Sequence, residues 1–150
     1  MNWNNIEKSW NEFAELNNVE LIYDERNLFH TIECKYEVHF QAEHGESSFS
    51  GVLWKSQDGH NRNRTKIFTK FSTEKSLHNF ELKNGGIKKL FLRNNLNDFE
   101  KNIARNLKEL NGKNLSLKDN VLEIELNGII SSKSVFDKVT ELIKKVKTYR

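Results

Sequence analysis

Residues 31–42 read Thr-Ile-Glu-Cys-Lys-Tyr-Glu-Val-His-Phe-Gln-Ala, and this stretch decides the fold of the chain. From Ile32 onward every second residue is apolar, and each residue between two apolar ones is polar. Side chains of a strand point alternately to the two faces of a sheet, so this segment has one apolar and one polar face. A parallel strand covered on both faces would not alternate in this way. The stretch therefore predicts a strand over about 29–42 in an antiparallel sheet with one wet face.

The flanking segments complete an α+β pattern. Apolar residues at spacings of three and four predict an amphipathic helix over 2–18. Further strands are predicted over 19–23, 49–56, 65–72, 77–83 and 87–93, with turns at 24–27, 43–48, 58–59 and 84–86. A hairpin is predicted over 115–126, with its turn at 118–120.

Two helices are predicted in the C-terminal half. Asn97 as N-cap and Glu100 three residues later open the first, and Gly112 lies just past its end. Ser134 as N-cap, with Asp137 at the third helical position, opens the second. Because runs of strands separate the helices, we predict one α+β domain over residues 1–150. All three helices should pack on one face of an antiparallel sheet.

Length and composition exclude several classes of protein. The chain has 150 residues, of which 36% are hydrophobic, 30% charged and 11% aromatic. The large aromatic side chains supply apolar area for a core, so intrinsic disorder is excluded. The longest apolar runs are three residues, far too short for a membrane-spanning helix. Cys34 is the only cysteine, so no intramolecular disulfide can form. The N-terminus shows no leader pattern, and we expect a cytoplasmic protein.

The C-terminal third has a recognisable pattern. Residues 114–128 read Asn-Leu-Ser-Leu-Lys-Asp-Asn-Val-Leu-Glu-Ile-Glu-Leu-Asn-Gly, and a helix rich in Leu and Val follows. This stretch resembles uncharacterised small bacterial α+β proteins of unknown function. The resemblance implies the same fold class and carries no activity.

The candidate metal ligands are not expected to form a site. His30, Cys34, His39 and His44 lie within a fifteen-residue window. On a strand, however, Cys34 and His39 point to opposite faces and cannot share an ion. We expect no metal and no cofactor, and a small, buried, unreactive Cys34.

No catalytic motif is apparent either. The chain has no nucleophile-elbow or phosphate-loop pattern, and Ser47 lies in a predicted exposed turn without motif context. Paired glutamates such as Glu33 and Glu37 alternate with apolar residues, which is typical of a solvent-facing strand. We expect a protein that is not an enzyme, and an enzyme with an unrecognised site stays an alternative.

Charge is unevenly distributed along the chain. Residues 1–50 carry ten acidic and three basic residues, whereas residues 51–150 carry 11 acidic and 21 basic ones, and the net charge is +3. This division predicts an acidic and a basic side, unless folding interleaves them. The candidate partner-binding residues are the acidic Glu33, Glu37, Glu43 and Glu46 and the basic Arg62, Arg64 and Lys66.

Two binding hypotheses follow, together with a solubilising alternative. The acidic residues favour a protein partner, such as a toxin or effector that an immunity protein would neutralise. The basic stripe favours nucleic-acid phosphates instead, although no aromatic side chains are expected among its charges, since Phe68 and Phe71 are expected in the core, and the net charge is small. The same stripe is also typical of a strand whose charges prevent sheet-to-sheet association. Oligomeric state is not indicated by the sequence.

Overall fold

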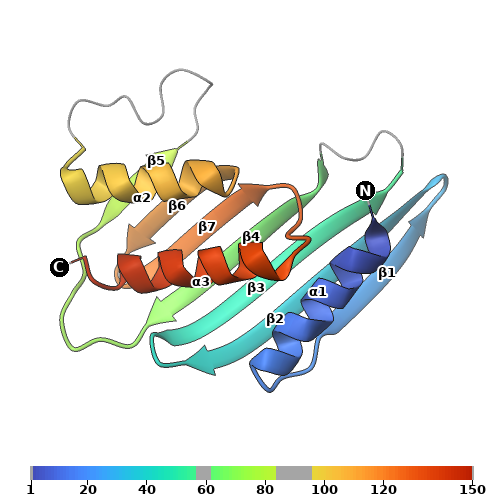
Figure 1. The fold of residues 1–150 in the computed structure, drawn as a ribbon, viewed down its shortest axis with the longest axis horizontal. Helices are drawn as coiled ribbons and strands as arrows, with labels where there is room; N and C mark the ends of the chain where they lie inside the picture. The colour runs from blue at the N-terminus through green and yellow to red at the C-terminus, as the bar shows by residue number, and fades with distance from the viewer. Residues whose placement is uncertain (1, 57–61, 84–95, 150) are drawn as a thin grey trace.

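The computed structural model of the chain describes residues 2–56, 62–83 and 96–149. These residues form three helices and a seven-stranded antiparallel sheet in the order β1-β2-β3-β4-β7-β6-β5. The elements are α1 Trp3–Leu16, β1 Ile22–Leu28, β2 Thr31–Ala42, β3 Gly45–Lys55, β4 Arg64–Phe71, β5 Phe80–Lys83, α2 Asp98–Glu109, β6 Gly112–Lys118, β7 Val121–Asn127 and α3 Lys133–Val146. All three helices lie on the same face of the sheet (Figure 1), which confirms the predicted α+β architecture.

The core lies between the helices and the sheet and is rich in aromatic rings. Helix α1 packs against β2 and α3, and α2 packs against β6 and α3. Phe13 of α1 stacks on Phe136 of α3 with ring centroids 4.2 Å apart. Trp10 lies edge-on to Phe136 at 5.1 Å, and its indole Nε1 donates a hydrogen bond of 2.9 Å to the carbonyl oxygen of Ile130. The middle of the helical stripe and the apolar side of β2 therefore meet as predicted, since Cys34, Tyr36 and Val38 are also buried, whereas Trp3 and Leu16 at the ends of the stripe are exposed.

The first strand differs from the prediction. The sequence predicted a strand over 19–23, ended by the run Asp24-Glu25-Arg26-Asn27, but β1 runs through this run as far as Leu28. Every residue of β1 is exposed, and β1 is the outermost strand, paired only with β2 among the described strands. An edge strand tolerates charged side chains that a central strand would exclude.

The turn between β2 and β3 is also shorter than predicted. It consists of Glu43 and His44 rather than 43–48, and β3 begins at Gly45. Gly45 has φ +140°, and a Cβ there would collide with the carbonyl oxygen of Lys70 on the neighbouring strand. Only glycine allows so early a start of β3.

Predicted and observed bounds differ at several element ends. Asn111, with φ 57°, rather than Gly112 follows α2 in the left-handed conformation. Helix α3 begins at Lys133 because Ser132, not Ser134, is its N-cap. Strand β5 begins at Phe80 rather than at 77. The predicted turns at 58–59 and 84–86 and the predicted strand over 87–93 lie outside the described residues.

Two predicted local structures are confirmed. The Asn97 side chain caps α2, accepting a hydrogen bond of 2.8 Å from the backbone of Glu100. Asp119 and Asn120 connect β6 and β7 with φ of 52° and 66°, as two-residue hairpin turns require.

The end of the chain returns to the start of α2. The Tyr149 ring stacks on Phe99 at 4.3 Å, and its hydroxyl donates to Glu100 at 2.8 Å while accepting from Asn97 at 2.6 Å. The backbone N–H of His78 donates to the Tyr149 carbonyl at 3.1 Å. Within the described ranges, no helix has the length and apolar character needed to span a membrane.

Candidate binding face

The sheet has one face that none of the described helices covers, and we call it the open face. It consists of the strand side chains that alternate with the core-facing ones. Because the strands are paired in register, these side chains form rows across the sheet. The central row runs through Ile22, Glu37, Ser50, Lys66, Glu125, Asn114 and Lys83.

The predicted acidic residues occupy one side of this face. Glu37 and Glu46 are on the open face of β2 and β3, and Glu37 lies 3.3 Å from the ring Nε2 of His39. Glu43 lies instead in the β2–β3 turn at the end of the sheet, where its carbonyl oxygen accepts from the amine of Lys147. The predicted surface therefore includes Glu37 and Glu46, whereas Glu43 borders it.

Glu33 is unexpectedly enclosed for a residue of the open face. Its exposed fraction is 9%, and its Oε1 lies 3.8 Å from Arg26 Nε and 3.7 Å from Lys35 Nζ. No described residue donates a hydrogen bond to this oxygen. The enclosure comes from neighbouring side chains of the same face, because Glu33 also lies opposite Trp54 in the β2–β3 register. The Glu33 carboxylate is therefore already held between two cations of this chain and is shielded from a partner.

The predicted basic residues lie on the same face as the acidic ones. Arg64 and Lys66 are exposed on β4 and share one side of that strand, as their parity predicted. The guanidinium of Arg62 lies 5.3 Å from the centre of the Trp54 ring, a cation–π contact.

The expectation of separate acidic and basic sides is therefore wrong. Strand β3 lies between β2 and β4, so Glu37 and Lys66 face the same Ser50 from its two sides. On its other side, Lys66 lies opposite Glu125 of β7. Antiparallel pairing thus interleaves charges of both signs on a single surface.

Aromatic side chains also lie on the open face, where the sequence predicted none. Phe68 was expected in the core together with Phe71, but 41% of Phe68 is exposed while Phe71 is only 5% exposed. The alternation of β4 explains the difference, because Phe71 shares the parity of Ile67 and Phe68 shares that of Lys66. Phe68 and Trp54 therefore accompany the basic stripe.

Around Phe68 the open face is hollowed into a groove of about 380 Å³. The groove crosses β3, β4, β7, β6 and β5. It is lined by Ser48, Ser50, Lys66, Ile67, Phe68, Glu81, Lys83, Asn114, Ser116, Glu123, Ile124 and Glu125. Its lining combines hydroxyls, amides and charges of both signs with one large aromatic ring. Such a surface can bury an apolar anchor and satisfy polar groups around it.

Two of the glutamates that line the groove are already paired. Glu125 accepts a hydrogen bond of 3.1 Å from Asn114 and lies 3.8 Å from the amine of Lys113. Glu81 lies 3.3 Å from the amine of Lys83. Each of these two carboxylates therefore already faces a lysine of this chain.

A serine and a histidine do come together elsewhere, but within the core. The ring Nε2 of His44 lies 3.0 Å from Ser47 Oγ, which lies 2.9 Å from Thr69 Oγ1. The expected exposed turn at Ser47 is wrong, because all three side chains are buried. Burial, with the charges of Lys147 and Lys144, lowers the pKa of His44. A substrate could not reach Ser47, and the chain of hydrogen bonds satisfies buried polar groups instead.

The remaining candidate ligands stay apart. Cys34 is buried among core residues, and its Sγ lies 3.3 Å from the Tyr23 hydroxyl, while His39 is exposed on the open face. Over residues 2–56, 62–83 and 96–149, no three His, Cys, Asp or Glu side chains are close enough to hold a metal ion.

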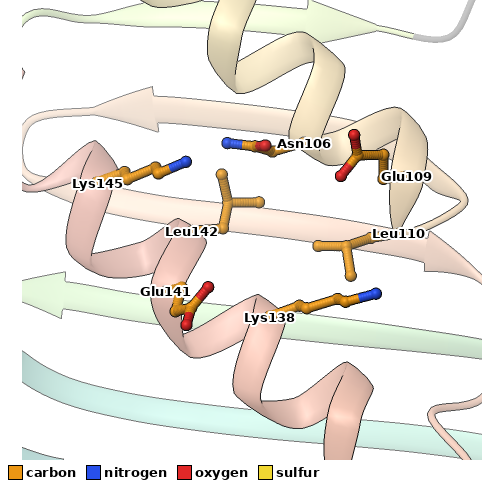
Figure 2. A pocket seen from close by; sticks show the side chains of 7 residues that line it. All are labelled: Asn106, Glu109, Leu110, Lys138, Glu141, Leu142 and Lys145. Atoms are coloured by element: carbon orange, nitrogen blue, oxygen red, sulfur yellow. The ribbon is translucent and has the colours of Figure 1, made fainter.

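A second, smaller cavity of about 160 Å³ lies between α2 and α3. Figure 2 shows Leu142 between the two helices, with Lys145 extending toward Asn106 and Lys138 extending toward Leu110. Leu142 and Leu110 are buried, so the base of the cavity belongs to the helix–helix contact. The groove of the open face is larger, and we take it as the candidate site.

No protein-family model, no curated protein and no solved structure matches the chain.

Proposed function

We propose that this protein is a non-catalytic, cytoplasmic binding module that binds another protein through the open face of its sheet. The observation that carries the proposal is the interleaving of Glu37, Lys66 and Glu125 in one row beside the exposed Phe68. A surface with charges of both signs around an aromatic anchor suits another protein, whose surface also carries both signs.

Within this class, an immunity or inhibitor role is the more specific proposal. The β2 side of the open face offers the carboxylates of Glu37 and Glu46. A lysine or arginine of a basic toxin or effector would pair with these carboxylates, and complementary charge would speed the encounter.

Nucleic-acid binding is the second candidate. It is supported by the contact between Arg62 and Trp54 and by Phe68 beside Lys66, since cations and aromatic rings together bind single strands. The carboxylates of Glu37 and Glu125 weaken this reading, because a phosphate backbone lying on Lys66 would meet them on both sides. Catalysis by an unrecognised site is the third alternative, and the paired carboxylates of the groove do not favour it.

The test compares charge and anchor variants with a matched control. Lys66→Glu and Phe68→Ala change the open face, whereas Lys108→Glu makes the same charge change on the exposed surface of α2. Immobilised wild type and Lys108→Glu should retain the same protein from nuclease-treated extract of the native cell, and the two open-face variants should lose it. Equal retention by all four proteins would contradict the proposal.

Nucleic-acid binding and the inhibitor role each predict an outcome of their own. Retention that disappears after nuclease treatment, falls steeply with salt and is lost in Arg62→Ala/Arg64→Ala would identify nucleic-acid binding. For the inhibitor role, co-production with a toxin encoded beside this gene should relieve growth arrest. Phe68→Ala should fail to relieve it while Lys108→Glu succeeds.

A further inference from the structure

Strand β1 forms an edge of the sheet that is available for pairing. It pairs with β2 on one side, and no described strand pairs with its other side. All of its residues are exposed, and Figure 1 shows it outside α1 at the rim of the molecule. A free edge presents a row of backbone donors and acceptors to any strand of matching sequence.

The sequence of β1 is complementary to a second copy of itself that runs in the opposite direction. If a second copy of β1 pairs in antiparallel orientation with Glu25 opposite Glu25, then Ile22 faces Leu28 and Asp24 faces Arg26. The exposed fractions of Ile22 and Leu28 are 53% and 39%, and this pairing would cover both side chains. Shifting the register by two residues would place Asp24 opposite Asp24 or Arg26 opposite Arg26, so the charges select one register.

The charge complementarity also includes residues of β2, the neighbour of β1 in the sheet. Asp24 lies opposite Lys35 in the β1–β2 register, and Arg26 lies opposite Glu33, with Nε and Oε1 3.8 Å apart. In the proposed dimer, one row of side chains would therefore cross both β1 strands. It would contain Lys35 and Asp24 of the first copy, followed by Arg26 and Glu33 of the second copy. The charge changes sign at every step of that row, and opposite charges facing each other across strands are stabilising.

We propose that two copies of this chain associate through β1, antiparallel and centred on Glu25, to form one continuous sheet. The paired residues share a face, so the helices of both copies lie on one side and their open faces adjoin on the other. The association does not depend on what the open face binds.

One contact opposes this association and provides a test of the register. Glu25 would face its own copy on the helix side of the sheet, where its Oε1 now accepts from the Tyr23 hydroxyl at 2.8 Å. Glu25→Gln keeps an oxygen acceptor for Tyr23 and removes the repulsion, so this variant should associate more tightly than the wild type.

Sedimentation velocity over a concentration series measures the association. The wild type should form dimers. Asp24→Arg and Arg26→Asp should each weaken self-association about tenfold or more, because each places two like-charged pairs at the edge. An equimolar mixture of the two variants restores both opposite-charge pairs between the copies, so it should associate more tightly than either variant alone. Lys108→Glu on α2 should have no effect.

Three outcomes would overturn the proposal. They are a wild type that stays monomeric at all concentrations, a dimer that both β1 variants leave unchanged, and a mixture no more associated than its components. Far-UV circular dichroism shows whether each variant keeps its strands. If a charge reversal unfolds the chain, Glu25→Gln decides the question, because failure to tighten the dimer contradicts the central pairing.

Discussion

The two phenylalanines of β4 provide a direct test of which face is open. Phe71 is 5% exposed and its ring lies 6.4 Å from that of His44, so Phe71→Ala removes a core side chain. Deleting such a ring costs about 3–5 kcal/mol of unfolding free energy, since a cavity remains. Phe68 is 41% exposed and borders an open groove, so Phe68→Ala leaves no enclosed cavity. Its cost should be about 1 kcal/mol.

The difference of about 2 kcal/mol or more is well within the range of urea unfolding monitored by far-UV circular dichroism at pH 7. Both variants should keep the slope of the wild-type transition, so that the midpoints report stability directly. Equal costs for Phe68→Ala and Phe71→Ala, or a larger cost for Phe68→Ala, would refute the assignment of faces. The proposed binding surface would be refuted with it.

Four further substitutions test the core and the turn. Trp10→Phe leaves the Ile130 carbonyl without its donor and should cost about 2–3 kcal/mol in urea unfolding, whereas Trp3→Phe at the exposed end of the helix should cost under about 0.5 kcal/mol. Burial lowers the pKa of His44 below its unfolded value of 6.5, so the unfolded chain binds the extra proton. Stability should therefore decline as pH falls below about 6.5, and thermal melts of His44→Gln should lack this part of the decline. Gly45→Ala meets the backbone of β4 at a φ that disfavours alanine, so soluble yield and melting temperature should both fall, and an unchanged melting temperature would contradict the described turn.

The alternation of residues 31–42 was sufficient to predict the sheet and its two faces. Cys34, Tyr36 and Val38 are buried as predicted, because strand geometry ties a period of two to opposite faces. Phe68 was wrongly predicted to lie in the core, because its apolar residue type was given more weight than its position in the alternation of β4. The alternation through Ile67 would have placed it on the open face.

Other features depend on pairings between distant segments. The charged run from Asp24 to Asn27 belongs to a strand because β1 is an edge, and edge position is set by the strand order rather than by local sequence. The interleaving of Glu37 with Lys66 likewise follows from β3 lying between β2 and β4. The buried chain that begins at His44 has no local signal at all.

Tyr149 has a practical consequence for anyone who shortens this chain. Its ring stacks on Phe99, its hydroxyl bonds to Asn97 and Glu100, and its carbonyl accepts from His78. Tyr149 therefore connects the start of α2 to the segment that leads into β5. A version trimmed after Thr148 would lose these contacts, and the N-terminal turn of α2 would fray more easily. Expression designs should therefore keep Tyr149 and place any purification tag after it.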